Sequence, residues 1–329
     1  MMSVTIKDIA NIAGVSYSTV SKALNDSPLV KHETKKKIVR IAKEMGYTPN
    51  YAAQKLVLKQ TKVIGLIWPT VERAVLSTLV TKISQEIHKT PYSMILSVDP
   101  IQQSIETFRR FQVDGMIIFE ENIDETIDNL RIPILSYGVA KDRILHYPVI
   151  DANHEEAMYQ AISHLHKLGH QRIAYIGDLS RNDALQKAKI NGFIKAMHAY
   201  GLPVHHDWVI DTHGLDWYDG YTATNKLLRK TLQPTAIVGG SYDISGGIIR
   251  AVKERNLQIP DDISIISYDN VPQMNNMEVP LTCIGVPIDE LATEIVNAMI
   301  KIIENNQEEI FVKKMTPVLV KRNSTIAIK

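Results

Sequence analysis

The sequence predicts a small all-α head followed by a larger α/β core with two lobes. The first sixty residues carry three short amphipathic helical patterns, whereas strand and helix patterns alternate from residue 62 onward. Basic residues are concentrated in the same first sixty of the 329 residues. Hydrophobic residues make up 45% of the chain, which is enough to bury the cores of two α/β lobes.

The charge of the chain is unevenly distributed. Ten of the 37 Lys and Arg and four of the 36 Asp and Glu lie in residues 1–60, a balance of +6. The remaining 27 basic and 32 acidic residues give residues 61–329 a balance of −5. A basic head on an acidic body is typical of a segment that binds a polyanion. The alternative is a solvated face on the helix expected over 31–45.

Several protein classes are excluded by composition. No apolar run approaches the ~20 residues that a membrane span needs. The first residues have neither the basic flank nor the apolar stretch of a secretory signal. Cys283 is the single cysteine, so no disulfide can form within the chain, and a cytoplasmic location fits. We expect Cys283 to be a small buried side chain.

Local signals define the three helices of the head. Thr5 and Asp8 resemble a capping box, and Gly14 ends the first helix. Ser16 is a good N-cap for a second helix that runs from Tyr17 to about Leu24. A loop over 25–28 precedes a third helix, which extends from about His32 to Met45.

The first two helices are close enough to form a helix-turn-helix. They are joined through Ala13-Gly14-Val15. In that motif the N-terminal side chains of the second helix contact base edges in the major groove, which indicates Tyr17, Ser18 and Lys22. The spacing alone is weakly specific, because many three-helix bundles share it.

From residue 62 the alternation of patterns predicts parallel sheets with helices on both faces. Strands are expected at 63–67, 92–97, 115–119, 132–136, 172–176, 236–238 and 263–268. Helices are expected at 76–89, 101–111, 154–168, 191–200 and 245–255.

The head carries a resemblance to a known family. The segments 4–10, 13–16 and 19–21 resemble the opening of the lactose-repressor (LacI/GalR) family, and the agreement extends to 317–325. The resemblance implies a helix-turn-helix domain over 1–47, a hinge helix over 48–60 and a core over 61–329 with the type I periplasmic-binding-protein fold. In this core we expect an N-lobe of about 61–157 and 288–315, and a C-lobe of about 158–287 and 316–329.

The resemblance also implies how DNA is bound. The hinge becomes helical in the dimer on operator DNA, where Leu56 acts as a minor-groove wedge and Lys55 and Lys59 lie near phosphates. Asn50 is the candidate N-cap, and a plain linker packed on the core is the alternative. The expected DNA-binding residues are Thr5, Ser16, Tyr17, Ser18, Thr19, Lys22, Asn25, Asn50, Ala53, Lys55, Leu56 and Lys59.

Several positions depart from the family pattern. Lys31 replaces the usual Ser at the start of the third helix and cannot accept from its amides, which costs about 1 kcal/mol. Lys22 replaces a frequent Arg. Its ammonium is a single charged donor, whereas the guanidinium of Arg donates two parallel hydrogen bonds. Lys189 replaces the Arg that commonly holds the effector, and Gly240-Ser241 replaces Asn-Asp. The segment 285–288 lacks the polar residue often found there.

Ligands of open α/β sheets bind beyond the carboxyl ends of the strands, so residues just after the strands are the candidates. Aromatic, carboxylate and cationic groups there suit a small polyhydroxylated ligand, and we expect a saccharide or sugar derivative. A purine is the rival, because Tyr137, Tyr242 and Trp68 are able to stack on a base. The alternative for each residue is a polar side chain on the surface of a loop, with no role in ligand binding. The candidates are Trp68, Glu72, Arg73, Tyr137, Arg181, Lys189, Ser241, Tyr242, Asp243 and Asp269.

Signatures of an enzyme are absent. The sequence has no Walker A loop, no Gly-x-Gly-x-x-Gly after a strand and no Gly-x-Ser-x-Gly elbow. His166 and His170 are four residues apart, but 168–173 matches a structural motif of the family. His205-His206-Asp207 is expected to be loop surface. We therefore expect no catalytic residue, no cofactor and no metal.

Together these features predict a homodimeric regulator. Each head is expected to bind one half-site of a near-palindromic double-stranded operator, and a small-molecule effector to change that binding. Repression is commoner than activation in the family. A purine or a phosphocarrier-protein corepressor is the alternative partner.

Overall fold

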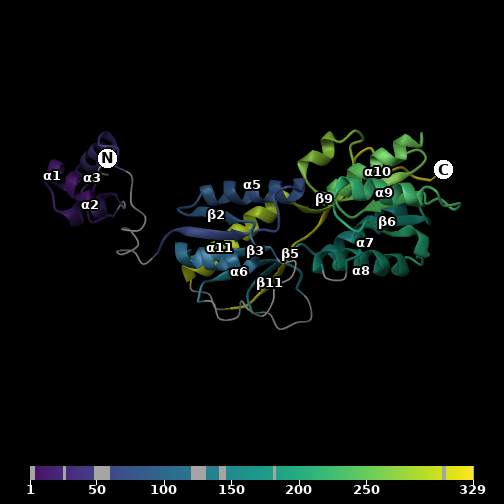
Figure 1. The fold of residues 1–329 in the computed structure, drawn as a ribbon, viewed down its shortest axis with the longest axis horizontal. Helices are drawn as coiled ribbons and strands as arrows, with labels where there is room; N and C mark the ends of the chain where they lie inside the picture. The colour runs from purple at the N-terminus through teal and green to yellow at the C-terminus, as the bar shows by residue number, and fades with distance from the viewer. Residues whose placement is uncertain are drawn as a thin grey trace. The chain divides into compact units, whose positions relative to one another are not determined.

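The computed structural model describes residues 4–24, 27–47, 60–119, 131–140, 146–180, 183–305 and 309–328 (Figure 1). The chain divides into two compact units, Met1–Thr61 and Lys62–Lys329. Among the described residues no helix is long and apolar enough to cross a membrane.

The first unit is a bundle of three helices, α1 (Ile6–Ala13), α2 (Tyr17–Leu24) and α3 (His32–Glu44). Apolar residues at helical spacing turn inward and form one small core. Its central members, Ile9, Val20 and Ile38, have no exposed surface. The predicted helices agree with the structure to within one residue at each end.

The helix ends of this unit have the predicted caps. Thr5 and Asp8 form the capping box, in which the Thr5 side chain accepts from the Asp8 amide and the Asp8 carboxylate accepts from the Thr5 amide. Gly14 ends α1 in the left-handed region at φ 69°, which favours glycine. Lys31 makes no side-chain capping bond to α3, as expected for a residue without an acceptor.

The N-lobe of the second unit contains a six-stranded sheet. Its order is β11 (Val312–Lys314), β5 (Val149–Asp151), β4 (Ile134–Gly138), β3 (Gly115–Phe119), β1 (Val63–Ile67) and β2 (Ser93–Ser97), and all neighbours are parallel. One face packs on α6 (Ile101–Phe111), and the other packs on α5 (Ala74–His88) and α11 (Ile288–Asn305).

The C-lobe contains a second six-stranded sheet. Its order is β12 (Val318–Val320), β10 (Thr282–Pro287), β9 (Ser264–Asn270), β8 (Ala236–Gly239), β6 (Ile173–Gly177) and β7 (Val209–Asp211). One face packs on α7 (His154–Lys167) and α8 (Ala184–Ala199), and the other on α9 (Trp217–Leu227) and α10 (Tyr242–Glu254). The expectation of purely parallel sheets is wrong for β12, which pairs antiparallel with β10 because the chain returns along the edge of the sheet.

The chain passes between the lobes three times. The passages follow β5, join β10 to α11 and join β11 to β12. The first passage lies before α7, because α7 begins at His154 and packs against α8 in the C-lobe. The expected boundary at 157 therefore falls inside a helix of the C-lobe.

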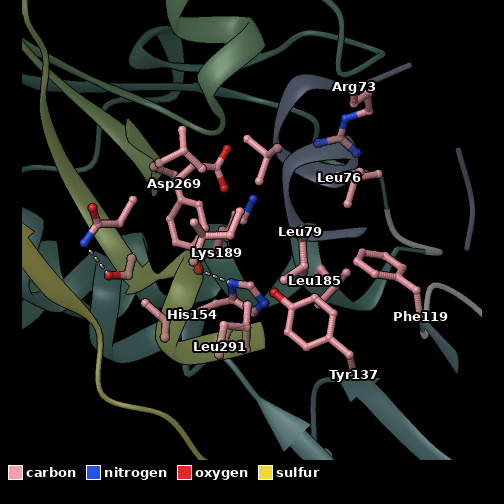
Figure 2. A pocket seen from close by; sticks show the side chains of 18 of the residues that line it. Arg73, Leu76, Leu79, Phe119, Tyr137, His154, Leu185, Lys189, Asp269 and Leu291 are labelled. Carbon is pink, nitrogen blue, oxygen red and sulfur yellow. Dashed lines mark hydrogen bonds between the residues drawn. The ribbon is translucent and has the colours of Figure 1, made fainter. Parts of the chain in front are cut away.

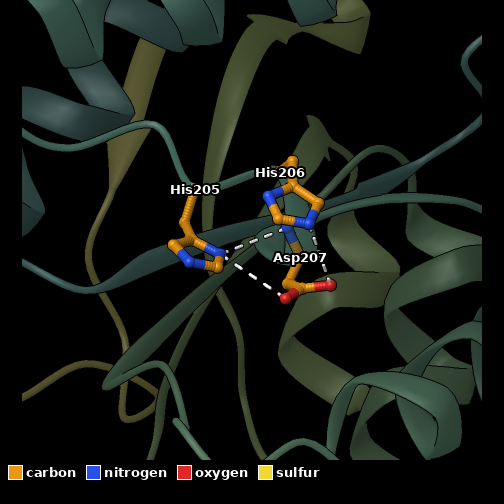
Figure 3. A group of neighbouring side chains, drawn as sticks. All are labelled: His205, His206 and Asp207. Carbon is orange, nitrogen blue, oxygen red and sulfur yellow. Dashed lines mark hydrogen bonds and ion pairs between the residues drawn. The ribbon is translucent and has the colours of Figure 1, made fainter.

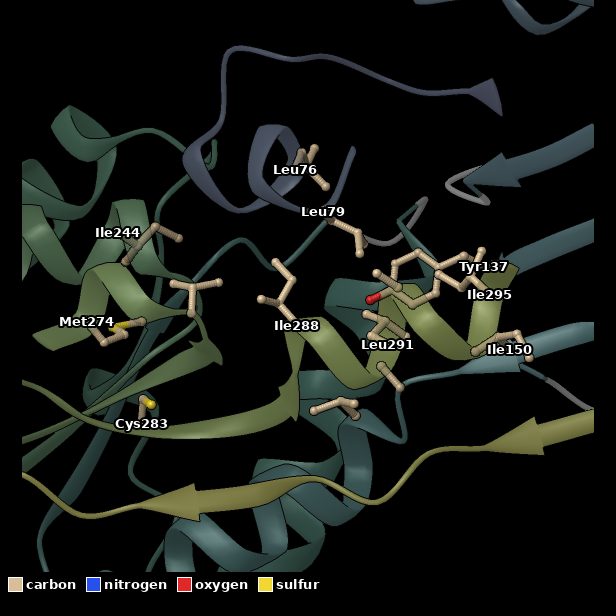
Figure 4. Close-up of a cluster of buried hydrophobic side chains, with 14 of the residues drawn as sticks. Leu76, Leu79, Tyr137, Ile150, Ile244, Met274, Cys283, Ile288, Leu291 and Ile295 are labelled. Atoms are coloured by element: carbon tan, nitrogen blue, oxygen red, sulfur yellow. The ribbon is translucent and has the colours of Figure 1, made fainter. Parts of the chain in front are cut away.

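Buried side chains of both lobes form one continuous apolar cluster where the lobes meet (Figure 4). Leu76 and Leu79 come from α5, and Leu291 comes from α11. Ile244 and Met274 come from the C-lobe. The ends of the strands that face this junction hold the candidate ligand residues.

Candidate functional site

The exposed surface of α2 carries the residues predicted to contact base edges. Tyr17, Ser18 and Lys22 are exposed, and 48% of the Tyr17 surface is accessible. Ser16 accepts a hydrogen bond from the Thr19 amide at 3.2 Å, so it caps α2 as predicted. Its hydroxyl also lies 2.9 Å from the Ser18 hydroxyl and 2.8 Å from the Thr19 hydroxyl.

Hydroxyl groups and an exposed phenol thus lie at the start of α2, and Lys22 lies in the last turn of the same helix. Thr5 is exposed at the start of α1, but its side chain is used in the capping box. Asn25, Asn50, Ala53, Lys55, Leu56 and Lys59 lie outside the described residues.

A pocket lies between the two lobes of the core (Figure 2). Residues at or just after the strand ends form part of its wall, including Phe119, Tyr137, Ala152, Asp269 and Gly285. This agrees with the rule that places ligands at the carboxyl ends of parallel strands. This pocket is lined by four of the candidates that were predicted from the sequence: Arg73, Tyr137, Lys189 and Asp269.

The two walls of this pocket differ in polarity. The N-lobe side is largely apolar, with Val75, Leu76 and Leu79 from α5 and Phe119 from β3. The C-lobe side carries more polar side chains, beside the apolar Leu185, Val271 and Val286. The polar ones are His154, Gln186, Lys189, Tyr268, Asp269 and Asn270.

Lys189 reaches the pocket from α8 and is 4% exposed. Its ammonium donates to the Gly240 carbonyl at 2.9 Å and lies 4.1 Å from the centre of the Tyr268 ring. Burial lowers the pKa of Lys189 to about 8, and Asp269 opposes this shift. Lys189 is thus a desolvated cation with no carboxylate of the described residues in salt-bridge contact.

Asp269 ends β9 with an unusual backbone conformation. Its φ of 83° lies in the left-handed region, which is uncommon for residues other than glycine. One carboxylate oxygen accepts from the Tyr242 amide at 2.9 Å. Asp269 therefore also anchors the start of α10, so it is not a fully free acceptor as the sequence suggested.

Tyr242 and Asp243 do not line this pocket. They line a second hollow on the C-lobe with Trp217, Arg250 and Met277. Burial and the nearby Asp269 raise the pKa of Asp243 to about 6, while Arg73 lowers it. Arg73, which precedes α5, is thus electrostatically coupled to this C-lobe carboxylate.

The remaining candidates lie elsewhere. Trp68 is 1% exposed and packs edge-on against Phe119, with ring centroids 4.9 Å apart, so Phe119 forms the pocket wall instead. Ser241 is buried and caps α10 through its hydroxyl, which accepts from the Ile244 amide. Glu72 is exposed and does not line the pocket. Arg181 lies outside the described residues.

Sequence reasoning missed His154, Gln186, Tyr268 and the apolar wall. His154 begins α7 just after β5, but β5 has only three residues and lacks a strand pattern of usual length. Gln186 was missed because α8 begins at Ala184, seven residues earlier than predicted. Asp183 caps that earlier start, accepting from the amides of Leu185 and Gln186.

The histidines near residue 166 have structural partners. Both ring nitrogens of His170 lie 3.0 Å from partners, the Thr235 hydroxyl and the Ile326 carbonyl. His164 lies 3.2 Å from the Thr325 hydroxyl. These contacts tie the last residues of the chain to the C-lobe and leave His170 without a nitrogen for a metal.

His205, His206 and Asp207 form another polar cluster on the surface of the C-lobe (Figure 3). Their potential ligand atoms lie within 4.8 Å of one another. The Asp207 carboxylate is already paired with the ammonium of Lys230 at 2.8 Å. The segment from His206 to Trp208 forms a short 3-10 helix at the surface position expected for a loop, with His206 exposed.

Known protein families match both units. A family model described as bacterial regulatory proteins, lacI family, matches residues 5–50. A second model, described as a periplasmic binding protein-like domain, matches residues 162–325.

Similar proteins align along almost the entire chain. The HTH-type transcriptional repressor PurR of Pasteurella multocida is 31% identical over 331 residues, covering 97% of this chain and 98% of that protein. The ribose operon repressor of Haemophilus influenzae is 28% identical over 340 residues and covers 99% of each chain. The structure of the lac repressor dimer bound to operator and the anti-inducer ONPF matches with a TM-score of 0.84. Its sequence is 25% identical, and the match covers 99% of this chain and 100% of that one.

Proposed function

The chain belongs to the lacI family of bacterial regulatory proteins, and from this premise we propose that it is a DNA-binding transcriptional repressor controlled by a small molecule. One observation carries the proposal: a basic helix-turn-helix unit and a two-lobed unit with a pocket occur together in one chain. The pocket is a binding site for a small molecule, and the helix-turn-helix unit supplies the DNA binding that this molecule controls.

The residues that contact the bases in this proposal are exposed residues of α2. Tyr17, Ser18 and Lys22 contact base edges in the major groove, while Ser16 and Thr19 hold the helix start in place and face the backbone phosphates. Lys22 donates to guanine through a single ammonium, so it discriminates guanine from the other bases less sharply than an arginine that donates two hydrogen bonds.

The effector in this proposal is a sugar or sugar derivative that contacts Lys189 and Asp269. A cation and a carboxylate on one polar wall suit the acceptors and donors of hydroxyl groups. The similar ribose operon repressor supports this class. Stacking on a purine base is the rival, for which Tyr137 lines the pocket, whereas Trp68 is buried behind Phe119 and Tyr242 lines a different hollow.

Control is a population shift between lobe arrangements. The pocket is lined by both lobes, so a ligand that contacts both binds one lobe arrangement better than another. That difference in affinity is the only free energy available to change operator binding, and by linkage the operator changes effector affinity equally.

The hinge provides the first test. Leu56→Ala is expected to abolish most of the operator bending and to keep non-specific DNA binding, because the apolar wedge that unstacks a base step is lost. Bending is measured by fluorescence energy transfer between the ends of an operator duplex. Leu58→Ala is the matched control and retains the bend. Full bending by Leu56→Ala would remove the wedge assignment.

The second test is the oligomeric state. The intact protein is expected to be a dimer, because a near-palindromic site is bound by a two-fold symmetric protein. Light scattering at micromolar concentration should give twice the chain mass of 37.0 kDa. A monomer, or a tetramer that does not dissociate on dilution, would contradict this prediction.

A further inference from the structure

Two buried polar atoms in the polar wall of the pocket have no partner among the described residues. They are Nε2 of His154 and Oε1 of Gln186, whose residues are 4% and 3% exposed. Both residues line the pocket between the lobes. Buried polar groups in folded proteins are almost always hydrogen-bonded, so an unpaired pair in a ligand pocket indicates where a ligand binds.

The hydrogen bond made by the other ring nitrogen of His154, Nδ1, determines whether Nε2 is a donor or an acceptor. Nδ1 is hydrogen-bonded to the Tyr268 hydroxyl. If the phenol donates to Nδ1, the imidazole hydrogen is on Nε2 and only that N–H is unpaired. If Nδ1 donates instead, both the phenolic hydrogen and the Nε2 lone pair lack partners within the described structure. Leaving fewer buried groups unpaired is favoured, so Tyr268 donates and His154 carries its hydrogen on Nε2.

The position of Lys189 also favours a neutral His154 that accepts from Tyr268 and carries its hydrogen on Nε2. Its ammonium lies against the face of the Tyr268 ring, where it makes the phenol a better donor and opposes a second positive charge on His154. Burial lowers the pKa of His154 to about 3, and Lys189 contributes to this shift. The other titratable groups around the pocket are Tyr137, Asp269 and Arg73. His154 is thus a neutral imidazole.

We propose that His154 is the N–H donor to the ligand and Gln186 its companion acceptor, so that the effector presents neutral hydroxyl groups to this wall. Either one hydroxyl or two neighbouring hydroxyls satisfy both atoms, because a hydroxyl donates and accepts. This inference rests on the proposed function, since it specifies which chemistry the same pocket selects.

Charged groups fit this wall poorly. A carboxylate or phosphate accepts from His154 and is attracted by Lys189, but it places negative charge against the Gln186 oxygen and the Asp269 carboxylate. An ammonium donates to Gln186 but meets the His154 N–H and the charge of Lys189. The two unpaired atoms of this polar wall therefore favour a neutral polyhydroxylated compound over sugar acids, sugar phosphates and amino sugars. Arg73 Nε also lacks a partner among the described residues, but it belongs to the N-lobe side of the pocket.

The first test needs no ligand. Nitrogen-15 spectra of the histidine rings in the full-length protein should contain, beside the ring of His170 whose Nε2 donates to the Ile326 carbonyl, a neutral ring with its hydrogen on Nε2 that does not protonate between pH 7 and pH 5. That signal should vanish in His154→Gln, which assigns it. A His154 ring that carries its hydrogen on Nδ1, or that protonates near its ordinary pKa, overturns the inference.

The second test uses a matched set of probes, each at the same concentration, with thermal stability of the full-length protein as the readout. D-Glucose and D-ribose are the neutral members, gluconate and glucose 6-phosphate the anions, and glucosamine the cation. We expect a neutral sugar to give the largest stabilisation. Its affinity should fall about tenfold in His154→Leu and recover in part in His154→Gln, which keeps an N–H donor.

Three results would overturn the inference: a larger shift with a charged member, no shift with either neutral sugar, or unchanged affinity in His154→Leu. Operator binding is measured on the same samples. Retained operator binding with any of these results refutes the ligand assignment alone, whereas absent operator binding in the unaltered protein refutes the proposed function.

Discussion

Raising the salt concentration from 50 to 200 mM is expected to lower operator affinity by about 10³–10⁵-fold. Residues 1–60 carry the basic excess of the chain, and binding them to phosphates releases condensed counterions. A steep and linear fall of log affinity with log salt follows. Fluorescence anisotropy with a labelled operator duplex, selected from random sequences, measures the slope.

A single lysine tests the origin of that slope. Lys59→Gln should reduce its magnitude by about 1, because one phosphate contact is removed. Lys301→Gln is the matched control, since Lys301 is exposed on α11 in the core and should leave the slope unchanged. A slope that is equally steep in both variants, or a salt-independent affinity in the unaltered protein, would rule out phosphate contacts by this segment.

Gly192→Val is expected to destabilise the core by about 3 kcal/mol, roughly a hundredfold in the unfolding equilibrium. A Cβ at this position would lie 2.6 Å from the Glu155 Cα and 3.0 Å from its carbonyl oxygen. Both atoms are backbone, so α7 and α8 must separate to admit the side chain. Urea unfolding of the full-length protein, followed by circular dichroism, measures the loss.

The neighbouring residue supplies the control for this substitution. Asn191 is exposed on the same helix, so Asn191→Val changes stability by only about 0.5 kcal/mol. The two variants add the same side chain one residue apart, which separates helix propensity from crowding. Equal destabilisation by both would show that the close approach of α7 and α8 is not what requires glycine.

The same close approach positions the pocket residues. Glu155 follows His154, and Gly192 lies one turn after Lys189, so the contact of the two helices sets how far His154 is from Lys189. Lys189 stands where the family commonly has the Arg that holds the effector, and the nearby Gly192 acts through packing. A valine at Gly192 is therefore also expected to weaken the response to any effector.

Local signals in the sequence were sufficient to predict some features. The caps of α1 and α2 and the missing side-chain cap at Lys31 depend on residues close in the chain, so they were predictable. The strand-end rule also placed Tyr137 and Asp269 in the pocket, because parallel strands in a sheet end at one edge, whereas Lys189 on α8 was indicated by the family resemblance.

Other elements depended on contacts between distant segments. Strands β5 and β7 have only three residues each, too few for an alternating pattern, and their pairing with longer neighbours defines them. Strand β12 runs antiparallel because the chain crosses back from the N-lobe before it joins β10. A pattern of alternating strands and helices contains no information on that last crossing.

By itself the sequence determined the two-unit organisation, the helix-turn-helix, and the edge of the sheets at which to look for a ligand. Only the tertiary structure decided which side chains line the pocket. It buried Trp68 behind Phe119, directed Tyr242 to another hollow, and brought His154 and Gln186 into one wall from helices that start 30 residues apart. The reason is physical: position along a strand places a residue at an edge, but burial and hydrogen-bond satisfaction depend on neighbours that are remote in the chain.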